Sequence, residues 1–204
     1  MTEAGFATAA PVRPDDRELG RALLTIARSA IAARLDLPHT GEPDAPDLAQ
    51  PAATFVTLHA YGELRGCIGS LEAARSLRID VRENAIAAAF RDPRFPPLGA
   101  GEFAAISIEV SLLSKPEPLF VDSEEDLARR LRPGVDGLIL DHDGRRVTYL
   151  PQVWDAIPDP REFVAALKRK AGWSQGFWGA RISVFRYGAT RWTERDALDR
   201  GTQR

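Results

Sequence analysis

The stretch that decides the fold runs from Phe55 to Gly69 and reads FVTLHAYGELRGCIG. Apolar and β-branched residues fill positions 55–58, a glycine marks a turn, and positions 64–70 continue as a second strand, so the segment predicts a β-hairpin. Gly66 and Gly69 are unusual inside a strand. They predict either a bulge or a place where another group approaches the backbone closely.

Helical and strand patterns follow one another on both sides of this hairpin. Apolar residues at helical spacing predict one helix from Pro14 to Leu35 and another over Ser76–Arg91. Apolar and polar residues alternate from Ile106 to Leu112, as in a half-buried strand. The four prolines of the Pro38–Ala53 segment predict a long surface loop.

The second half of the chain carries clear local signals. Asp143-Gly144 between two β-rich runs predicts a tight hairpin. Asp159-Pro160 and Gly172 are suited to the start and the end of one helix, and Ser123 begins a short acidic one. Residues 180–187 are typical of a last strand.

Hairpins alternate with single helices, and no regular β-α-β run occurs. We therefore predict an α+β fold with a mainly antiparallel or mixed sheet, flanking helices, a larger lobe and a smaller subdomain. We expect a mobile tail at residues 1–14, one domain over residues 15–190 and a polar tail at residues 191–204. A boundary near Leu119 sets off a subdomain of about 119–160, unless a common core merges the two.

Composition excludes several classes of protein. The chain has 204 residues, 44% of them hydrophobic, and a formal net charge of -2, so it forms a core and carries no global basic field. One cysteine and three histidines argue against disulfides and metal sites, and the spacings HxH, HExxH and CxxC are absent. Phosphate-binding glycine loops and a GxSxG elbow are also absent. With no secretory signal or long apolar run, we expect a cytoplasmic protein.

Charge is uneven along the chain. Residues 161–204 carry ten basic and four acidic side chains, with Trp173, Phe177, Trp178 and Trp192 among them. Such a segment either stacks on and neutralises nucleic acid, or is a solvated helix end with its aromatic residues in the core. The second interpretation is favoured.

The hexapeptide LRGCIG at Leu64–Gly69 resembles the signature of the AmmeMemoRadiSam system protein A family, which has an AMMECR-type domain. The resemblance covers about residues 17–190. Further matching segments, in chain order, are FVTL (55–58), ENAIAAAFRDPRFPPL (83–98), IEVSLL (108–113), GLIL (137–140), LPQVW (150–154) and EFVAALKRKAG (162–172).

The resemblance implies an α/β protein with a larger sheet-and-helix lobe and a smaller lobe. It also implies two partners, a MEMO-type protein similar to class III extradiol dioxygenases and a radical-SAM protein. It implies neither a reaction nor a cofactor. Where relatives often have a proline-rich LEPxxPL stretch, this chain reads LEAARSL at Leu71–Leu77, which leaves the role of that loop open.

Cys67 is the candidate nucleophile, since a thiolate is a strong one and the glycines beside it leave room for a substrate. We predict Gly66 and Gly69 as substrate-binding positions on that ground. Arg65 is predicted to lower the pKa of the thiol or to bind an anionic substrate. The alternative is that Cys67 is a small buried apolar residue.

His59 is a candidate base whose position depends on the register of the hairpin. With a three-residue turn, His59 faces Arg65 and lies diagonal to Cys67. With a two-residue turn at Gly62-Glu63, Leu58 opposes Cys67 and His59 points to the other face.

Three further polar residues are candidates. Glu109 is catalytic if its strand face lines a cleft with Cys67, and otherwise a solvent-facing carboxylate. Arg94 binds a substrate anion or anchors a loop, and Gln152 contacts a ligand or caps a helix. We predict an enzyme or enzyme subunit that uses Cys67; the alternatives are a non-catalytic adaptor and an RNA-binding module.

Overall fold

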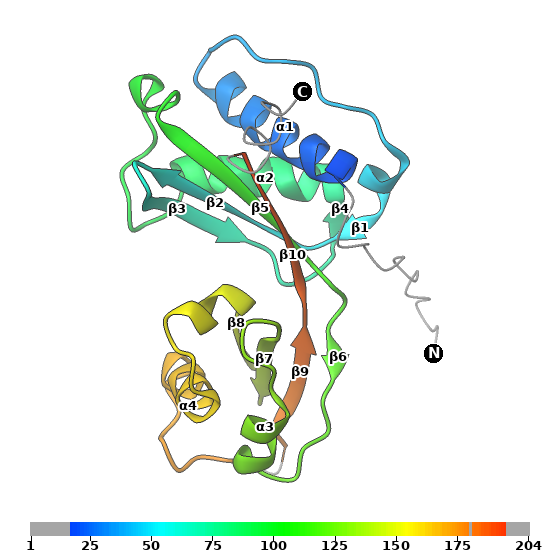
Figure 1. Ribbon diagram of the computed structural model, residues 1–204, viewed down its shortest axis with the longest axis vertical. Helices are drawn as coiled ribbons and strands as arrows, with labels where there is room; N and C mark the ends of the chain where they lie inside the picture. Colours follow the sequence, from blue (N-terminus) through cyan, green and yellow to red (C-terminus); the bar gives the residue numbers. More distant parts are fainter. Residues whose placement is uncertain (1–16, 180, 195–204) are drawn as a thin grey trace, which may run out of the picture. The chain divides into compact units, whose positions relative to one another are not determined.

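The computed structural model describes residues 17–179 and 181–194, and the fold is α+β (Figure 1). The tail expected at residues 1–14 lies outside the described residues. The chain divides into two compact units, the first made of residues up to Leu113 together with those from Thr190, and the second of Ser114–Ala189.

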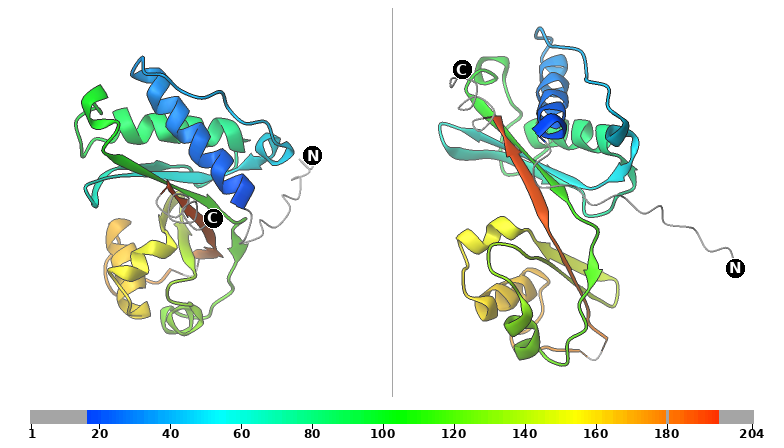
Figure 2. Two further views of the ribbon diagram at one scale, coloured as in Figure 1. Left: turned by 45° about the horizontal axis from the view of Figure 1, so that its top comes forward. Right: turned by 45° about the vertical axis from the view of Figure 1, so that its right-hand side comes forward.

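In the first unit, two helices cover one face of a four-stranded sheet (Figure 1, Figure 2). The strand order is β10-β5-β2-β3, so β3 lies at one edge. The main elements are α1 (Arg17–Arg34), β2 (Thr54–Ala60), β3 (Glu63–Gly69), α2 (Leu77–Phe90), β5 (Ile106–Leu113) and β10 (Ala189–Thr193). Shorter elements are η1 (Pro46–Ala49), β1 (Pro51–Ala52), β4 (Arg75–Ser76) and η2 (Ala100–Glu102).

The core of this unit lies between the helices and one face of the sheet. Ile106, Ile108, Val110 and Leu112 of β5 are buried, as the sequence pattern predicted, and the same alternation buries Val56 and Leu58 of β2. The expectation of a half-buried β5 is wrong, because Glu109 and Ser111 on its other face are buried as well. A fully buried aliphatic side chain contributes about 1.5–3 kcal/mol. The odd-numbered residues of both strands therefore lie on the other face, away from the helices.

The β2–β3 hairpin has a two-residue turn followed by a bulge. Tyr61 and Gly62 form the turn, with φ values of 53° and 90°. His59 pairs with Leu64 but Leu58 pairs with Gly66, so one extra residue of β3 lies between them. Beyond this bulge Thr57 is opposite Cys67 and His59 is diagonal to it, as expected for a three-residue turn. The expected pairing of His59 with Arg65 is wrong, because the bulge leaves Arg65 unpaired and His59 pairs with Leu64.

Gly66 and Gly69 allow other parts of the protein to approach β3 closely. A methyl carbon added at Gly66 would lie 2.2 Å from the carbonyl oxygen of Ala88 in α2, and one at Gly69 would lie 2.2 Å from the ring of Phe55. The predicted bulge and the predicted close approach are therefore both present, and the protein itself occupies the space beside each glycine.

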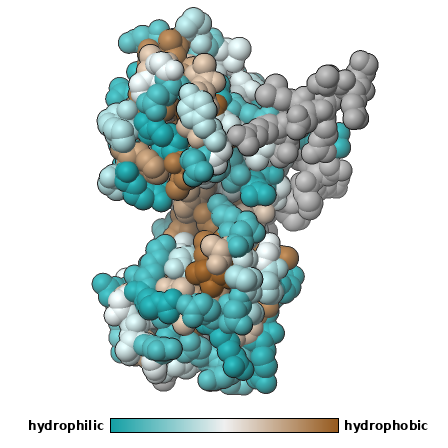
Figure 3. All heavy atoms as spheres, turned by 60° about the vertical axis from the view of Figure 1, so that its left-hand side comes forward, coloured by the Kyte–Doolittle hydropathy of each residue, from teal (hydrophilic) through white to brown (hydrophobic). Residues whose placement is uncertain are grey.

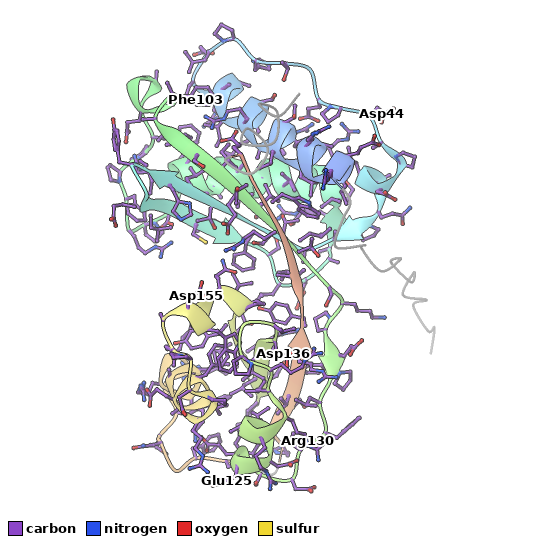
Figure 4. The ribbon with its side chains drawn as sticks, viewed as in Figure 1. Asp44, Phe103, Glu125, Arg130, Asp136 and Asp155 are labelled. Atoms are coloured by element: carbon purple, nitrogen blue, oxygen red, sulfur yellow. The ribbon has the colours of Figure 1, made fainter. Side chains whose placement is uncertain are left out.

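The second unit has its own sheet and core. The strand order is β6-β9-β7-β8, and Trp154 stacks on Phe163 with ring centroids 3.7 Å apart. Asp136, labelled in Figure 4, accepts the indole N–H of Trp154 on its carbonyl oxygen. The elements are β6 (Glu117–Pro118), α3 (Glu124–Arg130), β7 (Gly137–His142), β8 (Arg145–Tyr149), η3 (Pro151–Asp155), α4 (Pro160–Lys170) and β9 (Ser183–Tyr187).

The local signals of this unit are confirmed. Asp143-Gly144 forms the turn between β7 and β8, with both φ angles positive. The carboxylate of Asp159 accepts the backbone N–H of Glu162 at the start of α4, and Gly172 follows its end with a φ of 72°. Short-range chemistry was sufficient to place these boundaries.

The polar tail expected at residues 191–204 begins too early, because β10 continues to Thr193. The ring of Trp192 occupies the space beside Gly20 in the core, and the carboxylate of Glu194 binds Arg28 of α1. Because the segment carries many charged residues, its sequence did not reveal that Trp192 packs against the core. Residues 195–204 of that expected tail lie outside the described part of the chain.

In the part of the chain that the structure describes, no helix has the length and apolar character needed to cross a membrane. The face drawn in Figure 3 is largely hydrophilic, with hydrophobic residues in small groups.

Replacing Gly66 by alanine is expected to lower the free energy of unfolding by about 1–3 kcal/mol, because the new methyl group overpacks the helix backbone. Urea unfolding measures the change. Gly101→Ala is the control, since nothing lies within 4 Å of the carbon that it adds. If the two variants were equally stable, the close approach of α2 to β3 would be wrong.

Candidate functional site

Cys67 lies in the middle of the edge strand β3, and side chains of the loop after α2 bind its backbone. Its N–H donates to Oδ2 of Asp92 at 2.8 Å, and its carbonyl oxygen accepts Nη2 of Arg94 at 3.2 Å. An unpaired strand edge is open to aggregation. Here one carboxylate and one guanidinium make the hydrogen bonds that a further strand would make.

Asp92 and Arg94 also bind each other. Arg94 donates Nε to Oδ1 of Asp92 at 2.9 Å and Nη2 to Oδ2 at 2.6 Å. The Asp92 residue is 4% exposed. Hydrogen bonds from Arg94, and then from the backbone N–H of Cys67, hold the pKa of the Asp92 carboxyl well below its usual range. Asp92 is therefore a charged anchor for the backbone at Cys67.

The thiol of Cys67 is mainly neutral at neutral pH. Burial raises the pKa of Cys67, and the charges of Asp92 and Glu109 add to this effect. Two groups lower the pKa by less: the hydroxyl of Thr57, which donates to Sγ at 3.3 Å, and the charge of Arg94. The cation that acts on the thiol is thus Arg94, where the sequence predicted Arg65.

Four side chains, one from each strand, form a polar row on the sheet face away from α1 and α2. Thr57 is opposite Cys67 on one side and Glu109 on the other. Nη1 of Arg191 in β10 lies 3.7 Å from Oε2 of Glu109. We call Cys67, Thr57, Glu109 and Arg191 the polar row.

Arg65, the extra residue of the bulge, binds the protein rather than the thiol. Its Nε and Nη2 donate to the two carboxylate oxygens of Glu102 at 2.9 and 3.1 Å, and Nη2 also donates to the carbonyl of Pro96. Nη1 is buried without a partner among the described residues. Arg65 and Arg94 both lie within 6 Å of the ring centre of Phe95. Arg65 thus holds the loop that carries Phe95.

The structure brings Cys67 and Glu109 into one group, with His59 diagonal to the thiol. Gly66 and Gly69 belong to the same hairpin, but Ala88 and Phe55 fill the space beside them, as described above. The half-buried Gln152 lies in η3 of the second unit, outside this group, and stays a predicted substrate contact.

Sequence reasoning missed three residues of the site: Thr57, Asp92 and Arg191. Thr57 is a polar residue in an apolar strand run, a signal that was available. Asp92 stands in an Asp-Pro-Arg sequence and was interpreted only as a helix end. Arg191 had no local signal, because it lies in a segment that resembles a charged tail.

The AMMECR1 family model matches residues 24–192. This chain belongs to the AMMECR1 family. A protein of Methanothermobacter thermautotrophicus is 41% identical over 189 residues, which are 86% of this chain and 94% of that protein. A protein of Thermofilum pendens is 36% identical over 192 residues, 87% of this chain and 90% of that one. The sequence resemblance is confirmed for the AMMECR-type domain.

A solved structure of the same type supports the fold. The crystal structure of protein PH0010 from Pyrococcus horikoshii has a TM-score of 0.80 and 31% identity, and the match covers 89% of this chain and 94% of that one.

The described residues of this AMMECR1-family chain include no group of three or more histidine, cysteine, aspartate or glutamate side chains that could hold a metal ion.

The basic side chains at the end of α4 bind within the second unit. The ammonium of Lys168 is buried and donates to Glu124, and Arg169 pairs with Glu162. Lys170 donates to the carbonyl of Thr148 at 3.1 Å. These contacts support the interpretation of a helix end over that of a nucleic-acid surface.

Asp92→Asn is expected to lower the free energy of unfolding at pH 7 by about 1.5–3 kcal/mol, since hydrogen bonds to a charged group are lost. The Asp92 pKa is lowered in the fold, so its contribution is present above the ordinary value of about 3.9 and is lost as pH falls below it. The gap between the two proteins should therefore narrow from pH 5 to pH 3.

Chemical unfolding of both proteins across this range measures the gap. Asp44→Asn is the matched control, because the Asp44 side chain, labelled in Figure 4, is fully exposed. A gap that stayed constant with pH would contradict a charged Asp92 at the strand edge.

The alkylation of Cys67 by iodoacetamide is expected to keep rising above pH 8.5, the ordinary thiol pKa, because burial raises the Cys67 pKa. Thr57→Val removes a hydrogen bond that lowers this pKa, so the rate at pH 8 should fall about threefold or more. Thr57→Ser keeps the hydroxyl and serves as control. A rate that levels off near pH 7 would show a thiolate and contradict the neutral thiol.

Proposed function

We propose that this AMMECR1-family chain is an enzyme, or the substrate-binding subunit of one, that uses Cys67 as a nucleophile on a substrate bound along the polar row. The observation that carries the proposal is the alignment of Cys67, Thr57 and Glu109 on three adjacent strands, with the Thr57 hydroxyl donating to the sulfur.

A neutral thiol becomes a nucleophile only when its proton has an acceptor. In the proposed step the sulfur of Cys67 adds to the electrophilic carbon of a carbon–oxygen double bond of the substrate. The π bond breaks and its electron pair moves to the oxygen, while the thiol proton passes to the carboxylate of Glu109. The hydroxyl of Thr57 orients the sulfur. The Glu109 side chain is 10% exposed and lies in the same row as the thiol.

The other residues of the candidate site hold Cys67 in place. Arg94, with Asp92, fixes the backbone of Cys67, and Arg65 holds the loop that carries Arg94. Gly66 has no side chain, so the backbone of α2 can pack closely against the strand. Reacting groups must be held to fractions of an ångström, and such supporting contacts provide that precision.

Partners extend this proposal. We propose that MEMO-type and radical-SAM proteins, which the sequence resemblance implies, supply redox or metal chemistry in the same reaction sequence. We also propose that the protein works in the cytoplasm, where thiols stay reduced and Cys67 stays free. Tagged protein isolated from cells under native conditions should retain both partners. If neither is present at a stoichiometric level, the proposal that they act in the same reaction sequence is wrong.

A second candidate is a non-catalytic adaptor. The raised pKa of Cys67 and its tightly bound backbone favour it, since an inert structural cysteine has the same two properties. An adaptor needs the shape of the hairpin and has no need of the sulfur.

Complementation distinguishes the two candidates. In cells that lack their own copy, Cys67→Ser and Glu109→Gln should each abolish function while thermal melting changes little, because loss of a nucleophile or base costs about 10²–10⁴-fold in rate. Glu63→Gln, at an exposed position of β3, is the matched control. Full function with Cys67→Ser would reject the thiol enzyme and favour the adaptor.

A further inference from the structure

Arg191 differs from the other arginines near Cys67. Arg65 and Arg94 each donate two hydrogen bonds to a carboxylate of the protein. Arg191 lies 3.7 Å from Glu109, which is too long for a hydrogen bond, so it offsets the charge of Glu109 without donating to it.

The guanidinium of Arg191 therefore keeps its hydrogen-bonding capacity. A guanidinium has five N–H donors in a planar fork. Over the residues that the structure describes, that of Arg191 has the contact with Glu109 alone, and its side chain is 54% exposed. An accessible fork at the end of a polar row is available to a ligand.

We propose that Arg191 binds an oxyanion, a carboxylate or a phosphate, carried by the substrate that reacts with Cys67. The inference rests on the proposed function and adds the chemical class of its substrate. The planar fork matches both oxygens of a carboxylate or two of a phosphate. The role in anion binding that the sequence assigned to Arg65 and Arg94 then belongs to Arg191.

The order of the strands sets the length of this substrate. β3 and β10 are three strand positions apart, which places their backbones about 14 Å from each other. A ligand that contacts both Cys67 and Arg191 is thus elongated, with its electrophilic carbon at one end and its oxyanion at the other. Its middle lies over Thr57 and Glu109, where it needs polar groups.

The competing explanation is that Arg191 only balances the charge of Glu109. That role needs a positive charge and not a planar fork, so lysine would fulfil it completely. Recognition of an oxyanion by two parallel hydrogen bonds is weakened by lysine and lost with glutamine. The two explanations therefore differ in what Arg191→Lys does.

The first test compares two maleimides of similar length on the full chain, 6-maleimidohexanoic acid and neutral N-hexylmaleimide. The acid should react with Cys67 on the order of tenfold faster, after correction for their rates with free cysteine. Arg191→Gln should bring the ratio to about one, and Arg191→Lys should leave an intermediate value. Arg34→Gln removes an equal charge from an exposed position in the last turn of α1 and should leave the ratio unchanged.

The second test does not depend on the thiol. In the Cys67→Ser protein, millimolar glutarate or inorganic phosphate should raise the melting temperature, and Arg191→Gln should abolish the rise. Glutarate and phosphate are separate arms, and the one that binds more tightly identifies the oxyanion. Binding that is the same with Arg191→Gln, or fully retained with Arg191→Lys, would overturn the proposal.

The two proposals fail in different ways. If Cys67→Ser complements in cells while anion binding still depends on Arg191, the thiol enzyme is wrong and the oxyanion site stands. If Cys67→Ser abolishes function but no anion binding depends on Arg191, the thiol enzyme stands and the oxyanion site is wrong.

Discussion

Two buried carboxylates, Asp80 in the first turn of α2 and Asp92 just after its end, hold this helix against the β2–β3 hairpin. Asp80 accepts the backbone N–H and the hydroxyl of Thr54, and it also binds Ser70, Arg75 and Asn84. Asp92 binds the N–H of Cys67. A buried charge is tolerated only with such complete hydrogen bonding, so neither end of the helix can move without a large cost.

This constraint explains the glycine in the middle of the hairpin and the position of the thiol. With both ends of α2 fixed, the carbonyl of Ala88 comes so close to β3 that only Gly66 fits. The Cys67 side chain lies on the other face of the sheet, where burial raises the pKa of its thiol. A nucleophile at this position needs a base beside it, and the sheet places Glu109 in the same row. The carboxylate at the end of the helix thus fixes the backbone position from which Cys67 reaches the polar row.

Short-range signals were enough for much of the fold. The Asp143-Gly144 turn, the Asp159 cap and the alternation along residues 106–112 all lie within a few residues of the structure that they specify. The register of the central hairpin was harder, because one extra residue in a bulge changes which side chains share a face. Two registers were compatible with the sequence, and Cys67 has Thr57 opposite it only in one of them.

By itself, the sequence determined the helices, the hairpins, the family and the identity of Cys67 and Glu109 as the residues to consider, since periodicity, caps and motifs are local properties. Only the tertiary structure decided what surrounds them. Asp92 meets Cys67 across 25 residues, and Glu194 meets the N–H of Ile108 across 86. Pairings of this kind arise when distant strands and loops pack together to satisfy buried polar groups, and no short stretch of sequence encodes them.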